Sequence, residues 1–194
     1  MQKLARDDLY SLEDYAEIRP DFRARVMAHK QRRRVPIGAD ATLYFEDRMT
    51  IQYQVQEMLR AERIFEAAGI QEELDAYNPL IPDGNNWKAT LMMEYPDEEI
   101  RRQRLAELVG IEDCVWVQVS GFDQVLATAD EDMPRETDEK TSSVHFLRFE
   151  LSREQVGAVK AGAAIAMGIQ NANYQASVDP LDEASRAALA GDLD

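Results

Sequence analysis

The sequence predicts an α+β fold in which N-terminal helices, including one long central helix, pack on a mainly antiparallel sheet. Helical patterns dominate the chain before Trp87, and short apolar segments typical of strands dominate it from there onward. Helices that precede the strands, rather than alternating with them, favour an antiparallel sheet. The length of 194 residues suits one domain with a well-buried core, so we expect a single domain over residues 1–194.

The first helical patterns surround a proline. Ser11, with Asp14 three residues later, is typical of a helix N-terminus, and the short helix that follows is expected to end before Pro20. Pro20 fits the first turn of a second helix. One face of this second helix carries Phe22, Val26 and His29. A break follows, and then a short strand over residues 42–45.

The long central helix is predicted over residues 47–68. Asp47 can cap its first turn, and Gly69 suits its C-terminus. Glu62 lies in the middle of an apolar stripe of this helix, and Tyr53 lies on roughly the opposite face. The stripe consists of Ile51, Val55, Met58, Leu59 and Phe65. A carboxylate within such a stripe needs an explanation.

Four later segments are typical of strands. They cover residues 87–95, 114–119, 142–151 and 163–169. A turn at residues 120–123 is expected to fold the second strand into a hairpin with residues 124–129. Helices are expected in three places: between Pro96 and Gly110, after Ser152, and between Asp179 and Gly191. The highly charged segment 130–140 is predicted to be an exposed acidic connection.

Charge and composition exclude several classes of protein. The chain has 22 lysines and arginines against 37 aspartates and glutamates, a formal charge of −15, which disfavours nucleic acid as a partner. One cysteine excludes an intrachain disulfide, and two histidines supply no zinc or iron–sulfur spacing, so we expect neither a metal nor a cofactor. The lack of a signal sequence or a membrane-length apolar run predicts a cytoplasmic protein with no membrane partner.

Glu62 is the first candidate functional residue. None of the residues three and four positions away along the helix is a cation, so a buried Glu62 needs a proton or a partner from another element. Arg148, a lone arginine in an apolar strand, is the preferred partner. A structural ion pair between these two residues is favoured over a catalytic or ligand-binding role.

His145 is the second candidate. It alternates with Leu147 and Phe149 and therefore faces the expected core, which favours a structural histidine over a general base. Together, the candidate catalytic residues are Glu62, His145, Arg148 and Tyr53. No nucleophile motif, P-loop or dinucleotide-binding motif accompanies them.

Four segments carry a resemblance to a known family. They read "EDYAEIRPDFRARVMAHKQRRRV", "LYFEDRMTIQYQVQEMLRAERIFE", "GIQEELDAYNPLIPDG" and "VHFLRFEL". On these segments the chain resembles the bacterial family called domain of unknown function 3501, from about Leu4 to Leu189. The family has no established activity, so no residue role is carried over. Similar proteins tend to be encoded beside rubrerythrin, a non-haem iron protein, and an iron–sulfur oxidoreductase of heterodisulfide-reductase type.

The resemblance and the missing catalytic motifs together predict a protein of unknown function. We expect a non-catalytic accessory or interaction protein in a cytoplasmic redox or peroxide-response system, with rubrerythrin or the iron–sulfur oxidoreductase as partner. The alternative is a small-molecule enzyme or a metal-binding protein whose pocket lies around the long helix and contains the four candidate residues. A third hypothesis is a dimerising scaffold.

Overall fold

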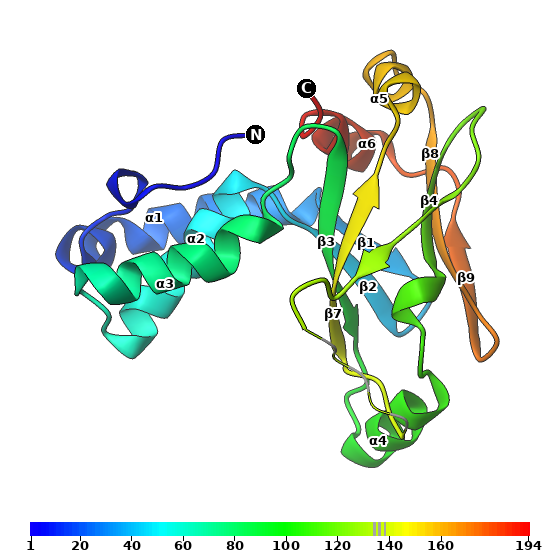
Figure 1. The fold of residues 1–194 in the computed structure, drawn as a ribbon, viewed down its shortest axis with the longest axis horizontal. Coiled ribbons are helices and arrows are strands. Elements are labelled where there is room, and N and C mark those ends of the chain that lie inside the picture. The colour runs from blue at the N-terminus through cyan, green and yellow to red at the C-terminus, as the bar shows by residue number, and fades with distance from the viewer. Residues whose placement is uncertain (134, 136, 138) are drawn as a thin grey trace.

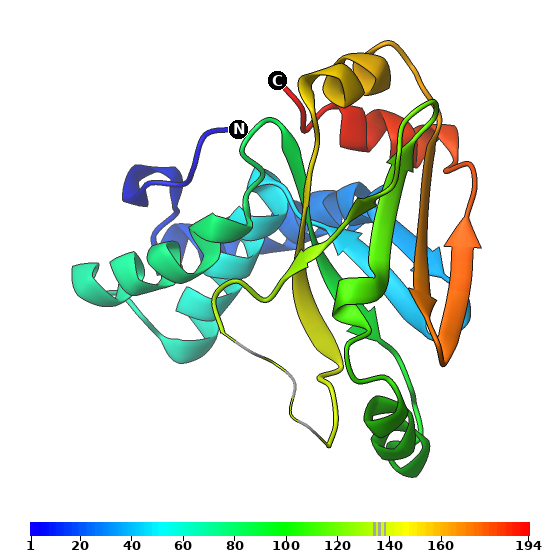
Figure 2. The same cartoon turned by 45° about the vertical axis from the view of Figure 1, so that its right-hand side comes forward.

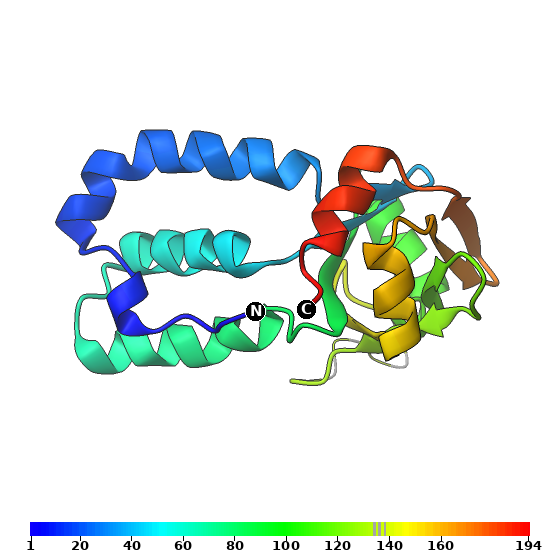
Figure 3. The same ribbon diagram turned by 90° about the horizontal axis from the view of Figure 1, so that it is seen from above.

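Three N-terminal helices form an arm that extends from one side of a β-sandwich (Figure 1). The computed structural model describes residues 1–133, 135, 137 and 139–194. The arm consists of α1 (Leu12–Gln31), α2 (Arg48–Glu62) and α3 (Ala67–Tyr77), which run side by side when seen from above (Figure 3). None of the helices in the described part of the chain is long and apolar enough to cross a membrane.

Two antiparallel sheets form the sandwich (Figure 2). The five-stranded sheet has the spatial order β1 (Arg34–Ile37), β2 (Ala41–Phe45), β3 (Asn86–Met93), β7 (Val144–Glu150) and β6 (Thr128–Ala129). The four-stranded sheet has the order β5 (Val125–Leu126), β4 (Val115–Val119), β8 (Ile165–Asn171) and β9 (Tyr174–Val178). These sheets, with the N-terminal helices, confirm the predicted α+β class.

The remaining helices close the two ends of the sandwich. In Figures 1 and 2, α5 (Arg153–Lys160) and α6 (Glu183–Ala190) lie at one end, and α4 (Glu98–Glu107) lies at the other. The described residues also include three single turns of 3₁₀-helix: η1 (Arg6–Asp8), η2 (Asn78–Leu80) and η3 (Glu112–Cys114). The cap predicted at Ser152 forms, since its hydroxyl accepts from the backbone N–H of Gln155.

The main core fills the space between the sheets. Trp87, at the start of β3, is fully buried and meets Phe45 edge-on, with ring centroids 6.5 Å apart. Its indole N–H donates to the carbonyl of Leu189 at 2.9 Å, which attaches α6 to the sandwich. On β7, His145, Leu147 and Phe149 point into this core and the alternate residues point outward, as the sequence pattern predicts.

The predicted hairpin after β4 is shorter than expected. Within residues 124–129 only Val125 and Leu126 pair with β4, and Thr128 and Ala129 then pair with β7 in the other sheet. The chain therefore crosses from one sheet to the other within five residues, 125–129. Strands β1 and β9 were not predicted. Strand β1 has only four residues, and the middle of β9 consists of the small or polar residues Gln175, Ala176 and Ser177, which give no apolar alternation.

Pro20 does not separate two helices, contrary to the sequence prediction. It lies inside the continuous helix α1, which makes α1 rather than α2 the longest helix of the arm. Proline removes one backbone donor from the helix. Burial of Tyr15 before it, and of Phe22 and Val26 after it, packs both parts of this helix against the rest of the arm.

The central helix ends earlier than predicted. Arg63 adopts a left-handed conformation with a φ of 57°, and its N–H donates to the carbonyl of Leu59, which ends α2 at Glu62. Gly69, expected to end the helix, instead lies within α3. A β-carbon there would lie 2.7 Å from the side chain of Ile64, so Gly69 allows α3 to approach the preceding loop.

A buried charge cluster, which we call the joint, connects the arm to the sandwich. Arg33, just after α1, is 3% exposed and pairs with Asp192, just after α6. Its guanidinium also lies 3.4 Å from Asp47, whose carboxylate caps α2 through the N–H of Thr50. His29 of α1 contacts the same carboxylate at 2.5 Å. The joint thus fixes where the arm stands relative to the five-stranded sheet.

The carboxyl group of Asp192 makes stability depend on pH. Burial raises the pKa of Asp192 from 3.8 to about 6, although the charge of Arg33 acts in the opposite direction. The folded chain therefore holds this proton more tightly than the unfolded chain does. Between pH 3.8 and about pH 6, the carboxyl group is protonated in the folded chain but ionised in the unfolded chain. A rise in pH over this range therefore lowers the free energy of unfolding.

We expect Asp192→Asn to remove this contribution. From about pH 4 to about pH 7, the free energy of unfolding of the variant should rise relative to that of the wild type by on the order of 2 kcal/mol. Urea denaturation at both pH values measures this change. A difference between variant and wild type that is the same at both pH values would contradict the assignment.

Candidate functional site

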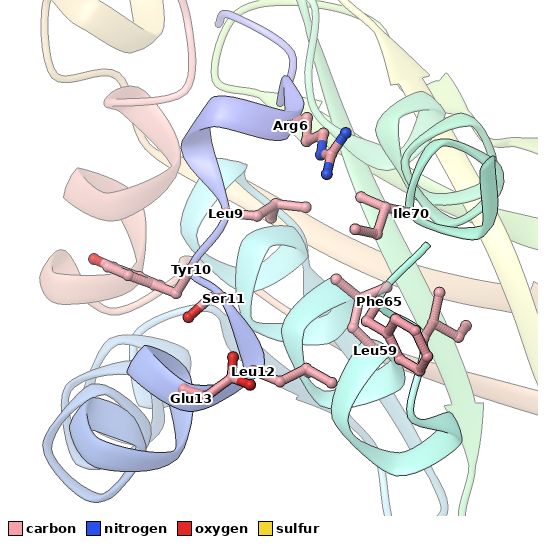
Figure 4. Close-up of a pocket in the computed structure, with 10 residues that line it drawn as sticks. Arg6, Leu9, Tyr10, Ser11, Leu12, Glu13, Leu59, Phe65 and Ile70 are labelled. Atoms are coloured by element: carbon pink, nitrogen blue, oxygen red, sulfur yellow. The ribbon is translucent and has the colours of Figure 1, made fainter. Parts of the chain in front are cut away.

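Glu62 lies at the exposed C-terminal end of α2. A hollow of about 400 Å³ lies beside this end of the helix, and residues 9–13 form its other wall (Figure 4). Figure 4 shows Leu9 and Ile70 pointing toward one another across it. Phe65, which was expected in the buried stripe, is 71% exposed because the helix ends before it. None of the four candidate residues lines this hollow.

The predicted ion pair between Glu62 and Arg148 is wrong. Arg148 lies on the outer face of β7 and forms two hydrogen bonds with Glu131, at 2.8 and 2.9 Å, and one with Glu150 at 2.6 Å. Its hydrogen bonds lower the pKa of the Glu131 carboxyl. Glu62 needs no buried partner because the break at Arg63 leaves it in solvent.

Tyr53 lies inside the arm. Its ring packs against Phe22 with centroids 6.1 Å apart, and the Lys30 ammonium lies 5.8 Å from the centre of the ring. The side chain is 8% exposed and belongs to the small core between α1 and α2. The structure therefore brings none of the four predicted site residues into contact with another.

A groove lies between the arm and the outer face of the five-stranded sheet, and we call it the arm groove. It consists of two adjoining hollows of about 760 Å³ and about 590 Å³. The larger hollow lies beside α3 and β7, and the smaller one lies between α2 and strands β2 and β3. Both are lined by Tyr77, Leu80 and Phe146, which form a shared apolar floor.

The cations that line the larger hollow are paired with carboxylates. Lys88 and Lys3 lie 2.6 Å and 2.7 Å from the carboxylate of Asp83. Although burial acts in the opposite direction, hydrogen bonds from these two lysines lower the pKa of Asp83 to about 2. Arg148 is the third cation of this hollow, and it is held by Glu131. Apolar contact, rather than a free charge, is therefore what this hollow offers to a ligand.

His145 lies on the opposite face of β7, with no exposed surface. Its Nδ1 is 2.6 Å from the carboxylate of Asp130 and 3.7 Å from that of Glu112. Its Nε2 lies 2.8 Å from the hydroxyl of Thr141 and 3.2 Å from the carbonyl of Ser142. His145 is thus a core histidine with polar partners on both ring nitrogens, consistent with the structural role that the sequence favours.

Thr141, His145 and Asp130 form a row that resembles a hydrolase triad, but its burial argues against catalysis. Thr141 is 2% exposed, so its hydroxyl has no path to a substrate in this conformation. Neither hollow of the arm groove is lined by any of these three residues. We therefore do not assign a nucleophile here.

Sequence reasoning missed Glu112 and Asp130. Asp130 belongs to the predicted exposed acidic connection, but its side chain is only 8% exposed and turns toward His145. Its backbone is left-handed, with a φ of 47°, which aspartate tolerates better than most residues. Pro134, Glu136 and Asp138 of the same connection lie outside the described residues. No sequence motif predicts that Glu112, Asp130 and His145 lie together, because their contacts are long-range.

Together, the fold and the arm groove define a two-part α+β protein with a hollowed face between its parts. The chain matches the family described as "Protein of unknown function (DUF3501)" over residues 3–193, and it belongs to that family. It is similar to a protein of unknown function from Burkholderia pseudomallei K96243 whose crystal structure has been solved, with 52% identity, full coverage of both chains and a TM-score of 0.95. No curated protein matches the chain.

Proposed function

We propose that this chain is a non-catalytic accessory protein that binds a partner protein through the arm groove. The partner belongs to a cytoplasmic redox or peroxide-response system, and rubrerythrin or an iron–sulfur oxidoreductase is the first choice. This choice of partner rests on the family resemblance alone. The binding surface rests on the arm groove.

The single observation that supports this proposal is the shared apolar floor of the two hollows. Each hollow has the volume of an ordinary small-molecule site, so two of them end to end exceed what one small ligand fills. An apolar centre surrounded by paired charges is also the usual composition of a protein interface. A short segment of a partner protein is the occupant that suits this shape.

The charge of the chain indicates which partner segments would bind. With a formal charge of −15, the protein attracts basic surfaces and repels acidic ones. An apolar segment flanked by basic side chains therefore suits the arm groove best. Met92, which is 36% exposed in the smaller hollow, is in position to contact such a segment.

Met92→Glu tests the proposal. The variant places a charge in the arm groove at a half-exposed position, so it should fold normally while recovering at least about tenfold less partner than the wild type. Affinity purification of each tagged protein from the native host under gentle conditions, followed by mass spectrometry, measures this recovery. Purified partner then gives the ratio of the two dissociation constants.

Met133→Glu is the matched control, because Met133 is 58% exposed and lines neither hollow. It should recover as much partner as the wild type. Equal recovery by the Met92 and Met133 variants would exclude the arm groove as the binding surface. If neither rubrerythrin nor an iron–sulfur oxidoreductase is recovered with the wild type, the assignment of the partner is wrong.

The volume of the larger hollow supports a second candidate, a small-molecule-binding protein. At about 760 Å³ it would hold one metabolite, next to α3 rather than at the predicted site around Glu62. Native mass spectrometry of protein purified from its own host separates the two candidates. A retained small molecule adds a discrete mass to the chain, whereas the accessory role predicts a complex with a second protein.

A further inference from the structure

Three side chains with metal-binding atoms meet at the inner face of β7. Glu112 comes from η3, Asp130 follows β6 and His145 belongs to β7. One donor atom of each lies within 4.8 Å of the other two. We propose that this cluster binds one divalent first-row transition-metal ion through His145 Nδ1 and one carboxylate oxygen each of Asp130 and Glu112. The cluster lies on the face of β7 opposite the arm groove, so this proposal does not rest on the function proposed above.

Asp130 is held so that one carboxylate oxygen faces the imidazole. Its Oδ1 accepts from the backbone N–H of Phe146 at 2.9 Å and from Arg135 at 3.1 Å. Its Oδ2 lies 2.6 Å from His145 Nδ1. The hydrogen bonds to Oδ1 orient the carboxylate, as outer hydrogen bonds orient the carboxylate ligands of known metal sites.

The other ring nitrogen of His145 favours the form that binds metals. Nε2 lies 3.2 Å from the carbonyl oxygen of Ser142, which can only accept a hydrogen bond. A proton on Nε2 satisfies this carbonyl and the nearby hydroxyl of Thr141. Nδ1 then presents a lone pair to the carboxylates of Asp130 and Glu112. In this tautomer three electron-rich atoms face one another, which is an arrangement that a metal ion can bind.

Either a proton or a metal ion can lie between these atoms. A proton on Nδ1 serves the contact with Asp130 at 2.6 Å, and Glu112 Oε1 lies 3.7 Å from the same nitrogen. The hydroxyl of Thr141 donates to the other oxygen of Glu112 at 3.3 Å, and Arg135 pairs with Asp130, so both carboxylates have polar partners without an ion. A divalent ion would displace the proton on Nδ1 and bind His145, Asp130 and Glu112 together.

The distances are close to what an ion requires. Ligands about 2.1 Å from a tetrahedral zinc ion lie roughly 3.4 Å from one another. The pair at 2.6 Å would open by roughly 0.8 Å, and the pair at 3.7 Å would close by roughly 0.3 Å. One imidazole and two carboxylates suit Zn²⁺, Mn²⁺ or Fe²⁺ rather than the soft Cu⁺ ion.

The experiment measures Zn²⁺ and Mn²⁺ binding to the full chain, produced without a histidine tag and stripped with a chelator. Competition with a chromophoric chelator should show one equivalent bound per wild-type chain. Asp130→Asn should weaken binding at least about 100-fold. Asparagine also tolerates the left-handed backbone and can accept from the N–H of Phe146, so this variant should still fold.

The two histidines allow a matched comparison. His145→Gln should also lose binding, whereas His29→Gln, which changes the histidine at the joint, should retain it. Circular dichroism and thermal unfolding in the stripped state establish that each variant is folded. If wild-type protein binds less than one equivalent, or if Asp130→Asn is folded and binds as tightly as the wild type, the proposal is overturned.

Discussion

Replacing Arg33 by alanine is expected to lower the free energy of unfolding by about 3–5 kcal/mol. Arg33 is the cation of the joint, and its removal leaves the carboxylates of Asp47 and Asp192 buried with less compensation. The carbonyls of Phe45 and Glu46 also lose a donor, because the guanidinium binds both at 3.1 Å. Urea denaturation followed by circular dichroism measures the loss.

The adjacent arginine provides the control. Arg34 is half-exposed and lies 3.9 Å from Glu94, so Arg34→Ala should cost less than about 1 kcal/mol. Similar losses for the two alanine variants would show that the joint is not the main attachment of the arm. Arg33→Lys keeps the charge but not the planar, forked donor, and an intermediate loss is expected.

Trp87→Ala is the second substitution with a large expected effect, again about 3–5 kcal/mol. The indole is fully buried at the centre of the sandwich, so its removal leaves a cavity against Phe45. It also removes the indole donor to the carbonyl of Leu189, whose other donors are backbone N–H groups of the chain end, and this should loosen the attachment of α6. Thermal and urea unfolding followed by far-ultraviolet circular dichroism measure the change without relying on tryptophan fluorescence.

Trp116, the other tryptophan, is a suitable comparison because it is only partly buried on β4. Trp116→Ala should cost roughly 1–2 kcal/mol, since less of its surface is withdrawn from water. Trp87→Phe separates the contribution of packing from that of the hydrogen bond, because phenylalanine keeps an aromatic ring but cannot donate to the carbonyl of Leu189. If Trp87→Ala costs no more than Trp116→Ala, Trp87 is not the centre of the core.

Much of the fold follows from local patterns that the structure preserves. The alternation on β7 predicts which residues face the core, because successive side chains of a strand point to opposite faces. The caps at Asp47 and Ser152 likewise depend only on neighbours three residues away. The left-handed conformation of Arg63 has no such local signal, so the end of α2 was placed too late.

The site was less predictable because its contacts are long-range. Glu62 was expected to be buried because the helix was predicted to continue past position 63. Since α2 ends at Glu62, its carboxylate needs no buried partner. Arg148 was correctly seen as an unusual arginine in an apolar strand, but its partner Glu131 lies in a segment without periodicity. Glu112 and Asp130 meet His145 only through long-range contacts: Asp130 follows β6, which pairs with β7, and Glu112 belongs to η3 before β4.

One hydrogen bond described above links the two faces of β7. The N–H of Phe146, whose ring forms part of the floor of the arm groove, donates to the same carboxylate that lies beside His145. An ion that repositions Asp130 would therefore act on the strand backbone beneath a bound partner. Thermodynamic linkage then requires reciprocity: the factor by which the ion changes the affinity for the partner equals the factor by which the partner changes the affinity for the ion.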